Sequence, residues 1–250
     1  MSEATIHHWT ASDGIELGWR EIGEGAAVVF VHGLFSDGQV NWIKFGHAAK
    51  IAATGKRVIM PDLRAHGLSG KPHERVHYPP GILGRDLIEF IDHLGLADYD
   101  LGGFSLGSRT IVQAIGQGLR PRRAMLAGMG LDGLEQWTGR SQFFLDAIAG
   151  FETASRGDPH WLAIQFMKTM GIDRVAAIPL LESFEPAPEG WRAAFTMPTL
   201  ILCGVDDRDN GSAPGLATAL PDASYAEVPG THMNSVTKAE FGDALARFLT

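Results

Sequence analysis

A serine with a glycine two positions before it and another two positions after it lies in the stretch DYDLGGFSLGS, residues 98–108. The first half of this stretch is typical of a short strand, and residues 106–118 carry the apolar spacing of a helix. A strand, a tight turn and a helix in this order would expose the Ser105 hydroxyl at the apex of the turn. Gly103 and Gly107 lack a Cβ atom, so they let the helix pass close to the turn. The pattern predicts that Ser105 is a nucleophile.

A serine hydroxyl is a weak nucleophile at neutral pH and needs an adjacent base. A neutral histidine can accept the hydroxyl proton and return it to the leaving group, and a carboxylate fixes the tautomer of that histidine and stabilises its charged form. The free N–H groups at the start of the helix after Ser105 would face the negative charge that develops on the attacked group. A serine nucleophile therefore requires a histidine and an acidic residue from elsewhere in the chain.

Together with several other motifs, the serine turn makes the chain resemble the α/β-hydrolase superfamily. These motifs include HGLF at residues 32–35, DLRAHGLS at 62–69 and GTHM at 230–233, and they occur in the order that the superfamily shows. The resemblance covers nearly the whole chain and is weakest over about 131–196. It implies an α/β fold with a mostly parallel central sheet flanked by helices, and a triad of serine, histidine and an acid.

The acid of the triad is implied by a pattern after a late strand. Superfamily members commonly carry it in a G-x-x-D sequence, which in GVDDRD, residues 204–209, selects Asp207. Asp206 and Asp209 are neighbouring alternatives. Asp132 is a further alternative, because some members carry the acid after the preceding strand.

The base and the oxyanion hole are implied by the same resemblance. The superfamily places its base on the loop between the last strand and the last helix, which here selects His232, with Thr231 where a glycine is more usual. The oxyanion hole would consist of the N–H groups of Leu34, after the His-Gly pair, and of Leu106, after the nucleophile.

Other polar residues in the two loops before the nucleophile are interpreted as structural. His32 and His66 precede Ser105, whereas the superfamily order is serine, acid, histidine. We therefore expect both histidines to hydrogen-bond neighbouring loops. Asp62 and Arg64 are expected to pair with each other and to pin their loop near the site.

Aromatic residues are enriched in the segment that the superfamily uses as a cap. The implied domains are a core of residues 1–130 and 197–250 and a small helical cap of residues 131–196, inserted before the strand that bears the acid. Nine of the 22 aromatic residues fall in the cap, where they could pack its helices or line an apolar pocket over Ser105. The candidate pocket residues are Phe35, Trp137, Phe143, Phe144 and Trp161.

Composition narrows the function classes. The chain has 250 residues, a formal net charge of −8 and one cysteine. An acidic chain without basic clusters is a poor nucleic-acid binder, and no apolar run approaches the roughly 18 residues of a membrane span. No signal peptide is visible and a single cysteine fits a reducing compartment, so we expect a cytoplasmic protein. The histidine spacing suggests no metal site and no nucleotide-binding motif occurs, so we expect no cofactor.

These residues predict a cofactor-independent serine hydrolase that cleaves a small or medium apolar ester, or a related acyl bond, through an acyl-enzyme on Ser105. Perhydrolase or haloperoxidase-like activity and hydrolysis of carbon–carbon bonds use the same triad and remain alternatives. Dehalogenases and epoxide hydrolases of the superfamily carry Asp at the position of the nucleophile, so Ser105 argues against both activities. An alternative of another class is a non-catalytic ligand-binding protein on the same fold.

The elements that must position these residues are predicted from apolar runs and periodicity. Residues 5–22 should form an antiparallel hairpin. Besides the strand before Ser105, strands are predicted at 26–31, 57–60, 122–127, 198–203 and 224–228. Besides the helix after Ser105, core helices are predicted at 41–54, 82–94 and 238–249, and cap helices at about 136–154, 158–170 and 172–183.

Overall fold

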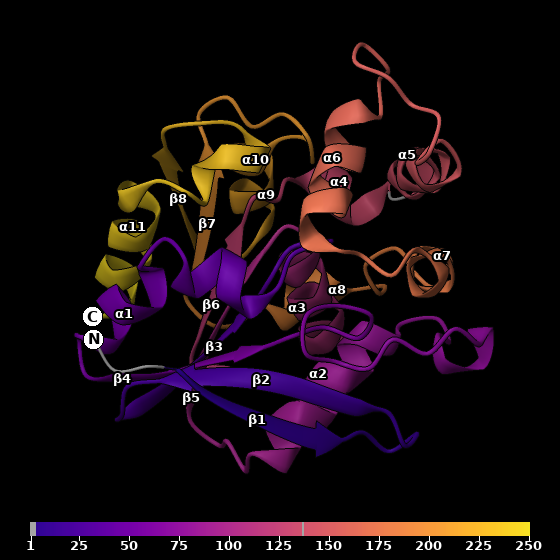
Figure 1. The fold of residues 1–250 in the computed structure, drawn as a ribbon. Coiled ribbons are helices and arrows are strands. Elements are labelled where there is room, and N and C mark those ends of the chain that lie inside the picture. The colour runs from indigo at the N-terminus through magenta and orange to yellow at the C-terminus, as the bar shows by residue number, and fades with distance from the viewer. Residues whose placement is uncertain (1–3, 137) are drawn as a thin grey trace.

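The computed structural model describes residues 4–136 and 138–250, in which helices cover both faces of one sheet (Figure 1). The sheet has eight strands in the order β1-β2-β4-β3-β5-β6-β7-β8. Strand β2 pairs antiparallel with β1 and β4, and the other neighbours pair parallel. The strands are β1 (Thr5–Thr10), β2 (Glu16–Ile22), β3 (Ala26–Val31), β4 (Lys56–Pro61), β5 (Tyr99–Phe104), β6 (Arg123–Ala127), β7 (Thr199–Gly204) and β8 (Ala223–Val228). The predicted fold class is confirmed.

The central strands are mostly apolar because both faces of the sheet are buried. Successive side chains of a strand point to opposite faces. In β3, Val29 and Val31 join the apolar cluster around α2 and α3, whereas Val28 and Phe30 join the cluster around α1 and α11. The helices that cover the sheet are α1 (His47–Ala52), α2 (Ile82–His93), α3 (Leu106–Gly116), α9 (Ala213–Ala219) and α11 (Ala239–Leu249).

Three distant stretches of sequence meet at one edge of the sheet. Strands β5, β7 and β8 run parallel, so their carboxyl ends lie at the same edge, which is where open α/β sheets bind ligands. The serine turn follows β5, the GVDDRD stretch contains the end of β7, and the GTHM stretch follows β8. The topology therefore brings Ser105, Asp207 and His232 to one edge.

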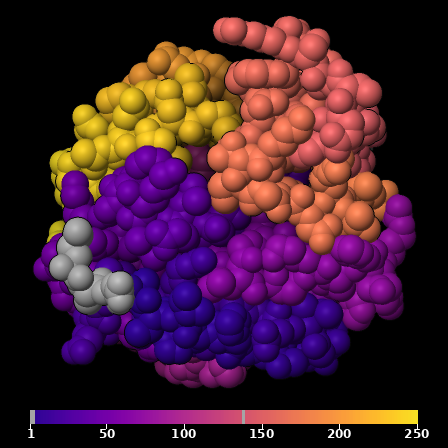
Figure 2. Space-filling view, viewed as in Figure 1, coloured from indigo at the N-terminus to yellow at the C-terminus, as the bar shows by residue number. Residues whose placement is uncertain are grey.

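Short helices fill the segment between β6 and β7. Figure 1 shows α5, α6 and α7 above this edge of the sheet, and Figure 2 shows the same salmon and orange segment projecting from the body of the molecule. A third apolar cluster, which includes Ile164, Met167 and Leu181, holds these helices together. The helices are α4 (Leu131–Glu135), α5 (Thr138–Ala149), α6 (Trp161–Met170), α7 (Arg174–Glu182) and α8 (Trp191–Ala194). The domain boundaries at 131 and 196 stay a prediction.

The structure differs from the predicted elements in two ways. The helix predicted at 41–54 is divided into a short wide turn of helix, η1 (Gln39–Ile43), and α1, because Gly46 has a φ of 80° and interrupts the helical path. The structure also contains short helices that were not predicted, namely η2 (Arg75–His77), α4, α9 and α10 (His232–Ser235). His232 is consequently the first residue of α10 rather than a loop residue.

Candidate active site

The backbone at Ser105 forms a strained turn between β5 and α3. Its φ of 53° and ψ of −110° lie outside the regions that a residue with a side chain normally adopts. The Ser105 N–H donates to the carbonyl of Ala127, 2.8 Å away on the neighbouring strand β6. A Cβ atom on Gly103 would lie 2.5 Å from the Gly107 carbonyl carbon, and one on Gly107 would lie 2.1 Å from the Val31 oxygen. The glycines are therefore required by close backbone contacts.

Hydrogen bonds join the three residues that the sheet brings together. The Ser105 Oγ lies 2.9 Å from His232 Nε2, and His232 Nδ1 lies 2.9 Å from an oxygen of Asp207. With its proton on Nδ1, the imidazole donates to Asp207 and accepts from the Ser105 hydroxyl. Phe104 stacks on the imidazole at a centroid distance of 5.1 Å. Asp207 and His232 are buried, whereas Ser105 is partly exposed.

Asp207 is the carboxylate that contacts His232 among the described residues. The alternatives Asp206, Asp209 and Asp132 are exposed, and the Asp209 carboxylate pairs with Arg140 instead. Burial acts to raise the pKa of Asp207, but the hydrogen bond and charge of His232 and the N–H of Asp209 outweigh burial and lower it below its usual value. Asp207 is therefore ionised at neutral pH.

The only cysteine of the sequence lies beside this carboxylate. The Cys203 Sγ is 3.8 Å from the Asp207 Oδ2, and burial raises the pKa of the thiol to about 12. Cys203 is thus a neutral residue of β7 that packs behind the acid.

The two residues expected to form an oxyanion hole lie on segments that adjoin the serine turn. A Cβ atom on Gly33 would lie 3.6 Å from the Ser105 Cβ, which places the turn that contains Leu34 against the nucleophile. Leu106 is the first residue of α3, and the N–H groups of a first helical turn have no acceptor within the helix. The peptide group between His32 and Gly33 is held by Asn41, whose side-chain oxygen accepts the Gly33 N–H at 2.7 Å.

His32 and His66 bond loops, which is the structural role expected for them. The His32 ring bonds the Gly33 carbonyl through Nδ1 at 2.8 Å and accepts the Leu63 N–H at Nε2. The His66 ring bonds the Arg64 carbonyl through Nδ1 and accepts the Phe35 N–H at Nε2, 3.0 Å away. Burial lowers the pKa of both rings, that of His66 to about 3.

The expected pairing of Asp62 with Arg64 is wrong. Arg64 instead forms a two-pronged bond to Asp86 on α2 and also bonds Asp13. Asp62 pairs with Arg20 at 2.6 Å and accepts backbone N–H groups from both neighbouring loops. The two side chains face different elements, so each pins the loop through a separate partner.

Sequence and structure comparisons identify the fold and the family. Residues 26–130 match the family described as "alpha/beta hydrolase fold". Over these residues the chain belongs to the α/β-hydrolase superfamily. An esterase from Exiguobacterium antarcticum has a similar solved structure, with a TM-score of 0.77 over 97% of this chain and 98% of the other at 18% identity. At that identity, the likeness is one of fold.

Two curated relatives carry different activities in their names. The chain is 38% identical over 98 residues to an epoxide hydrolase from Caballeronia sordidicola, a match that covers 39% of this chain and 29% of the relative. It is 32% identical over 169 residues to a non-heme haloperoxidase from Rhodococcus erythropolis, covering 56% and 58%. The matched stretches thus span less than two thirds of either relative.

Three of the five candidate pocket residues of this α/β-hydrolase form a chain of aromatic contacts. Phe35 is buried and meets Phe144 edge-on at a centroid distance of 5.5 Å, and Phe144 in turn meets Phe143 at 5.3 Å. Phe143 is 36% exposed and also lies over the His160 ring, while Trp161 is half-buried at the start of α6. Trp137 lies outside the described residues. Phe35 thus belongs to the cap's own apolar cluster, and the pocket assignment stays a prediction.

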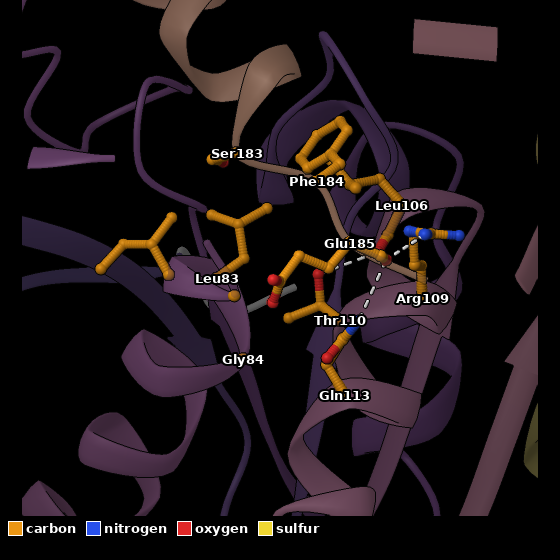
Figure 3. A pocket seen from close by; sticks show the side chains of 11 residues that line it. Leu83, Gly84, Leu106, Arg109, Thr110, Gln113, Ser183, Phe184 and Glu185 are labelled. Carbon is orange, nitrogen blue, oxygen red and sulfur yellow. Dashed lines mark hydrogen bonds between the residues drawn. The ribbon is translucent and has the colours of Figure 1, made fainter. Parts of the chain in front are cut away.

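Two polar residues of α3 that the sequence did not point out connect the nucleophile helix to the cap. Arg109 and Gln113 both donate to the carbonyl of Glu185 (Figure 3). Arg109 also donates to the carbonyl of Gly133, and Gln113 to that of Pro186. Arg109 and Gln113 follow Ser105 at intervals of four residues, so they share one face of α3. The four-residue spacing was the sequence signal that could have placed Arg109 and Gln113 on the same helix face.

Two cavities lie near these segments, and neither is lined by Ser105 or His232. The smaller, of about 20 Å³, lies between α2, α3 and the chain at 183–185, and Leu106 and Arg109 are among its lining residues (Figure 3). The larger, of about 370 Å³, lies between the loops after β3 and β4 and the end of α6, with Arg20 and Lys71 among its polar lining. Within the described ranges no three His, Cys, Asp or Glu side chains cluster as a metal site would require, and no helix has the length and apolar character to span a membrane.

Proposed function

We propose that this protein is a serine hydrolase that cleaves a small or medium apolar ester through an acyl-enzyme on Ser105. The observation that carries the proposal is the unbroken hydrogen-bonded chain from the Ser105 hydroxyl through His232 to Asp207. In this proposal Ser105 is the nucleophile, His232 the base and Asp207 the acid. The substrate is a small molecule, and the chain's own residues supply all the chemistry.

Acylation follows from the positions of these atoms. The Ser105 Oγ attacks the ester carbonyl carbon as its proton passes to His232 Nε2, and the carbonyl oxygen becomes an oxyanion. Collapse of the tetrahedral intermediate breaks the bond to the alcohol oxygen, which takes the proton back from Nε2. The products of this half-reaction are a free alcohol and an ester between the acyl group and Ser105.

Deacylation repeats the same steps with water. His232 Nε2 removes a proton from a water molecule as the water oxygen attacks the acyl carbon, and the second intermediate releases the Ser105 oxygen, which is reprotonated by the histidine. The acid product leaves as a carboxylate. In both halves the N–H groups of Leu34 and Leu106 would bind the oxyanion, and losing one such donor typically costs about 3–4 kcal/mol of transition-state stabilisation.

The relatives' names do not decide between the reactions that this triad can perform. Ser105 counts against the chemistry of the epoxide hydrolases, because those members of the superfamily carry Asp at the position of the nucleophile. The haloperoxidase relative supports a perhydrolase as the second candidate. In that reaction hydrogen peroxide replaces water in deacylation and a peracid leaves in place of the carboxylic acid.

Covalent labelling and turnover test the proposal together. A fluorophosphonate probe should label the wild-type protein but not Ser105→Ala, and only the wild type should hydrolyse a short p-nitrophenyl ester. Wild-type protein that neither reacts with the probe nor turns over any ester would instead support a ligand-binding protein. Adding hydrogen peroxide with acetate and measuring peracetic acid separates the perhydrolase: an acid-to-peracid rate that exceeds ester hydrolysis would favour it.

A further inference from the structure

Two imidazoles join the loops that follow β3 and β4. We call residues 32–38 the first loop and residues 62–70 the second loop. His32, from the first loop, accepts a backbone N–H of the second loop at 2.9 Å, and His66, from the second loop, accepts a backbone N–H of the first loop at 3.0 Å. The two rings lie edge to face at a centroid distance of 5.0 Å and are completely buried. The loops are therefore bonded to each other in both directions.

Each imidazole also bonds a carbonyl of its own loop. His32 Nδ1 lies 2.8 Å from the Gly33 oxygen, and His66 Nδ1 lies 2.9 Å from the Arg64 oxygen. Because each Nε2 accepts from an N–H, each ring must be neutral and carry its proton on Nδ1. Burial favours that neutral form in both rings. A neutral imidazole with this tautomer thus connects two backbone segments through one hydrogen bond to each.

These bonds fix the peptide groups on either side of Leu34. The Gly33 carbonyl and the Leu34 N–H belong to one planar peptide group and point in opposite directions. The bond from His32 to the Gly33 carbonyl therefore also sets the direction of the Leu34 N–H. The next peptide is held by His66, which accepts the Phe35 N–H. Phe35 has a φ of 58°, a conformation that costs free energy for a residue with a side chain and persists only where neighbours impose it.

The second loop provides a rigid base for His66. Arg64, next but one before it, is fully buried and bonds Asp13, Asp86 and the His77 carbonyl. Ala65 has a φ of 68°, so the backbone between Arg64 and His66 is also held in a restricted conformation. The position of the His66 ring is therefore imposed from the β1–β2 turn and from α2.

We propose that His66, together with His32, positions the Leu34 N–H so that it points at the oxyanion. This proposal rests on the proposed function, because it assigns the two histidines to the oxyanion hole of the ester hydrolase. Neither ring touches the reacting atoms in this scheme. Their contribution is the orientation of one peptide group, so it is made in the transition state and not in substrate binding.

Three variants of the full-length protein test the proposal. His66→Ala removes the acceptor of the Phe35 N–H, and we expect kcat for a short p-nitrophenyl ester to fall at least about tenfold while KM changes less than about threefold, since misdirecting one donor costs part of the 10²–10³ of its full removal. His66→Gln offers an amide oxygen near the position of Nε2 and should recover most of kcat. Ser69→Ala is the matched control, because Ser69 is also buried in the second loop and bonds Gly18 and Asp62, but contacts neither imidazole in the described bonds.

A second readout separates positioning from loosening of the loop. An aryl boronic acid, which forms a tetrahedral adduct with a serine, should lose affinity for His66→Ala in parallel with kcat, whereas Ser69→Ala should keep wild-type affinity and kcat even where its melting temperature falls. Equal kcat losses in His66→Ala and Ser69→Ala, or a His66→Ala variant that retains wild-type kcat and boronate affinity, would overturn the proposal. If His66→Ala does not fold, wild-type kcat in His66→Gln still supports it and a kcat loss in Ser69→Ala still overturns it.

The proposed function can fail separately. In that case the wild-type protein would show no hydrolysis that depends on Ser105, and the assignment of His66 would fall with it. A wild type with Ser105-dependent turnover that is insensitive to His66 would leave the proposed function intact and reject only the positioning role.

Discussion

Asp207 can be separated from its neighbours by single isosteric substitutions. Asp207→Asn keeps the side-chain shape but removes the acceptor that holds the proton on His232 Nδ1, so kcat should fall by about 10⁴. Asp206→Asn and Asp209→Asn are matched controls, since both are exposed and neither contacts His232 in the described bonds. Ester hydrolysis measures all three. A larger loss in Asp206→Asn or Asp209→Asn than in Asp207→Asn would contradict the assignment of the acid.

The base of the triad should be indispensable for activity. His232 accepts the Ser105 proton during acylation, so His232→Ala should lower kcat for a short p-nitrophenyl ester by several orders of magnitude while the protein stays folded. The lowered pKa of Asp207 keeps that carboxylate ionised through weakly acidic pH, so the acid can still hold the histidine there. Wild-type kcat in His232→Ala would remove the imidazole from the mechanism.

At the scale of elements, the turn after β5 tolerates no side chain at its second glycine. A Cβ on Gly107 would meet the Val31 and His32 carbonyl oxygens at 2.1 and 2.9 Å, and backbone atoms cannot move aside as flexible side chains do. Gly107→Ala should therefore cost at least about 1–3 kcal/mol of stability, the usual cost of overpacking. Gly139→Ala is the control: its Cβ would meet nothing within 4 Å in α5, so stability should stay the same or rise by up to about 1 kcal/mol. Urea unfolding measures both, and equal stabilities would contradict the close contact.

The cap should loosen when its connection to α3 is cut. Arg109 bonds the carbonyls of Gly133 and Glu185, which lie in two separate parts of the cap segment, so Arg109→Met should expose amides near 131–135 and 183–188 to faster hydrogen exchange. Arg140→Met serves as the comparison, because Arg140 lies on α5 and bonds Asp209 outside this connection. Exchange measured by mass spectrometry decides the matter. Unchanged protection at both ends in Arg109→Met would show that apolar packing alone holds the cap.

How far the elements could be read from the sequence depended on their length and burial. The strand, turn and helix around Ser105 were predictable for two reasons. Apolar residues flank the turn on both sides, and close backbone contacts require the two glycines around Ser105. The helices α9 and α10 have seven and four residues, too few for periodicity to show. Arg64 was given the wrong partner because the charges of a loop do not indicate which element each side chain faces. The bonds of Arg109 to the cap were not predicted because their acceptors are backbone carbonyls, and every residue type has a backbone carbonyl.

For the whole molecule, buried histidines predict a loss of stability in weak acid. Burial lowers the pKa of His32, His47 and His66 below the value of 6.5 expected in the unfolded chain. Below pH 6.5 the unfolded chain binds these protons and the folded chain does not, so each ring reduces stability by up to about 1.4 kcal/mol per pH unit, for His66 down to about pH 3. The urea concentration at the midpoint of unfolding should therefore decrease as the pH is lowered from 7 to 5. His47→Gln should make that dependence shallower, and a midpoint that is constant over this range would contradict the burial of neutral rings.

The cap as a whole predicts the size of the substrate. Its apolar cluster includes Phe35, and the cavity that Leu106 helps to line has a volume of only about 20 Å³. Short-acyl aryl esters should therefore exceed long-chain and charged esters in kcat/KM. A series of p-nitrophenyl esters from acetate to palmitate, with a succinate half-ester as the anionic member, measures this preference. A maximum at long chains or at the anionic ester would contradict an apolar pocket of modest size.

The bond between Ser105 and His232 joins residues that are 127 positions apart in the chain. The Ser105 and His232 side chains can bond only when β5, β6, β7 and β8 lie side by side in the sheet. The chain must therefore close long loops before the site exists. Helical signal in refolding experiments reports local structure that needs no such closure. After dilution from denaturant, hydrolytic activity should thus return later than helical circular dichroism, and the delay between them times the assembly of the sheet.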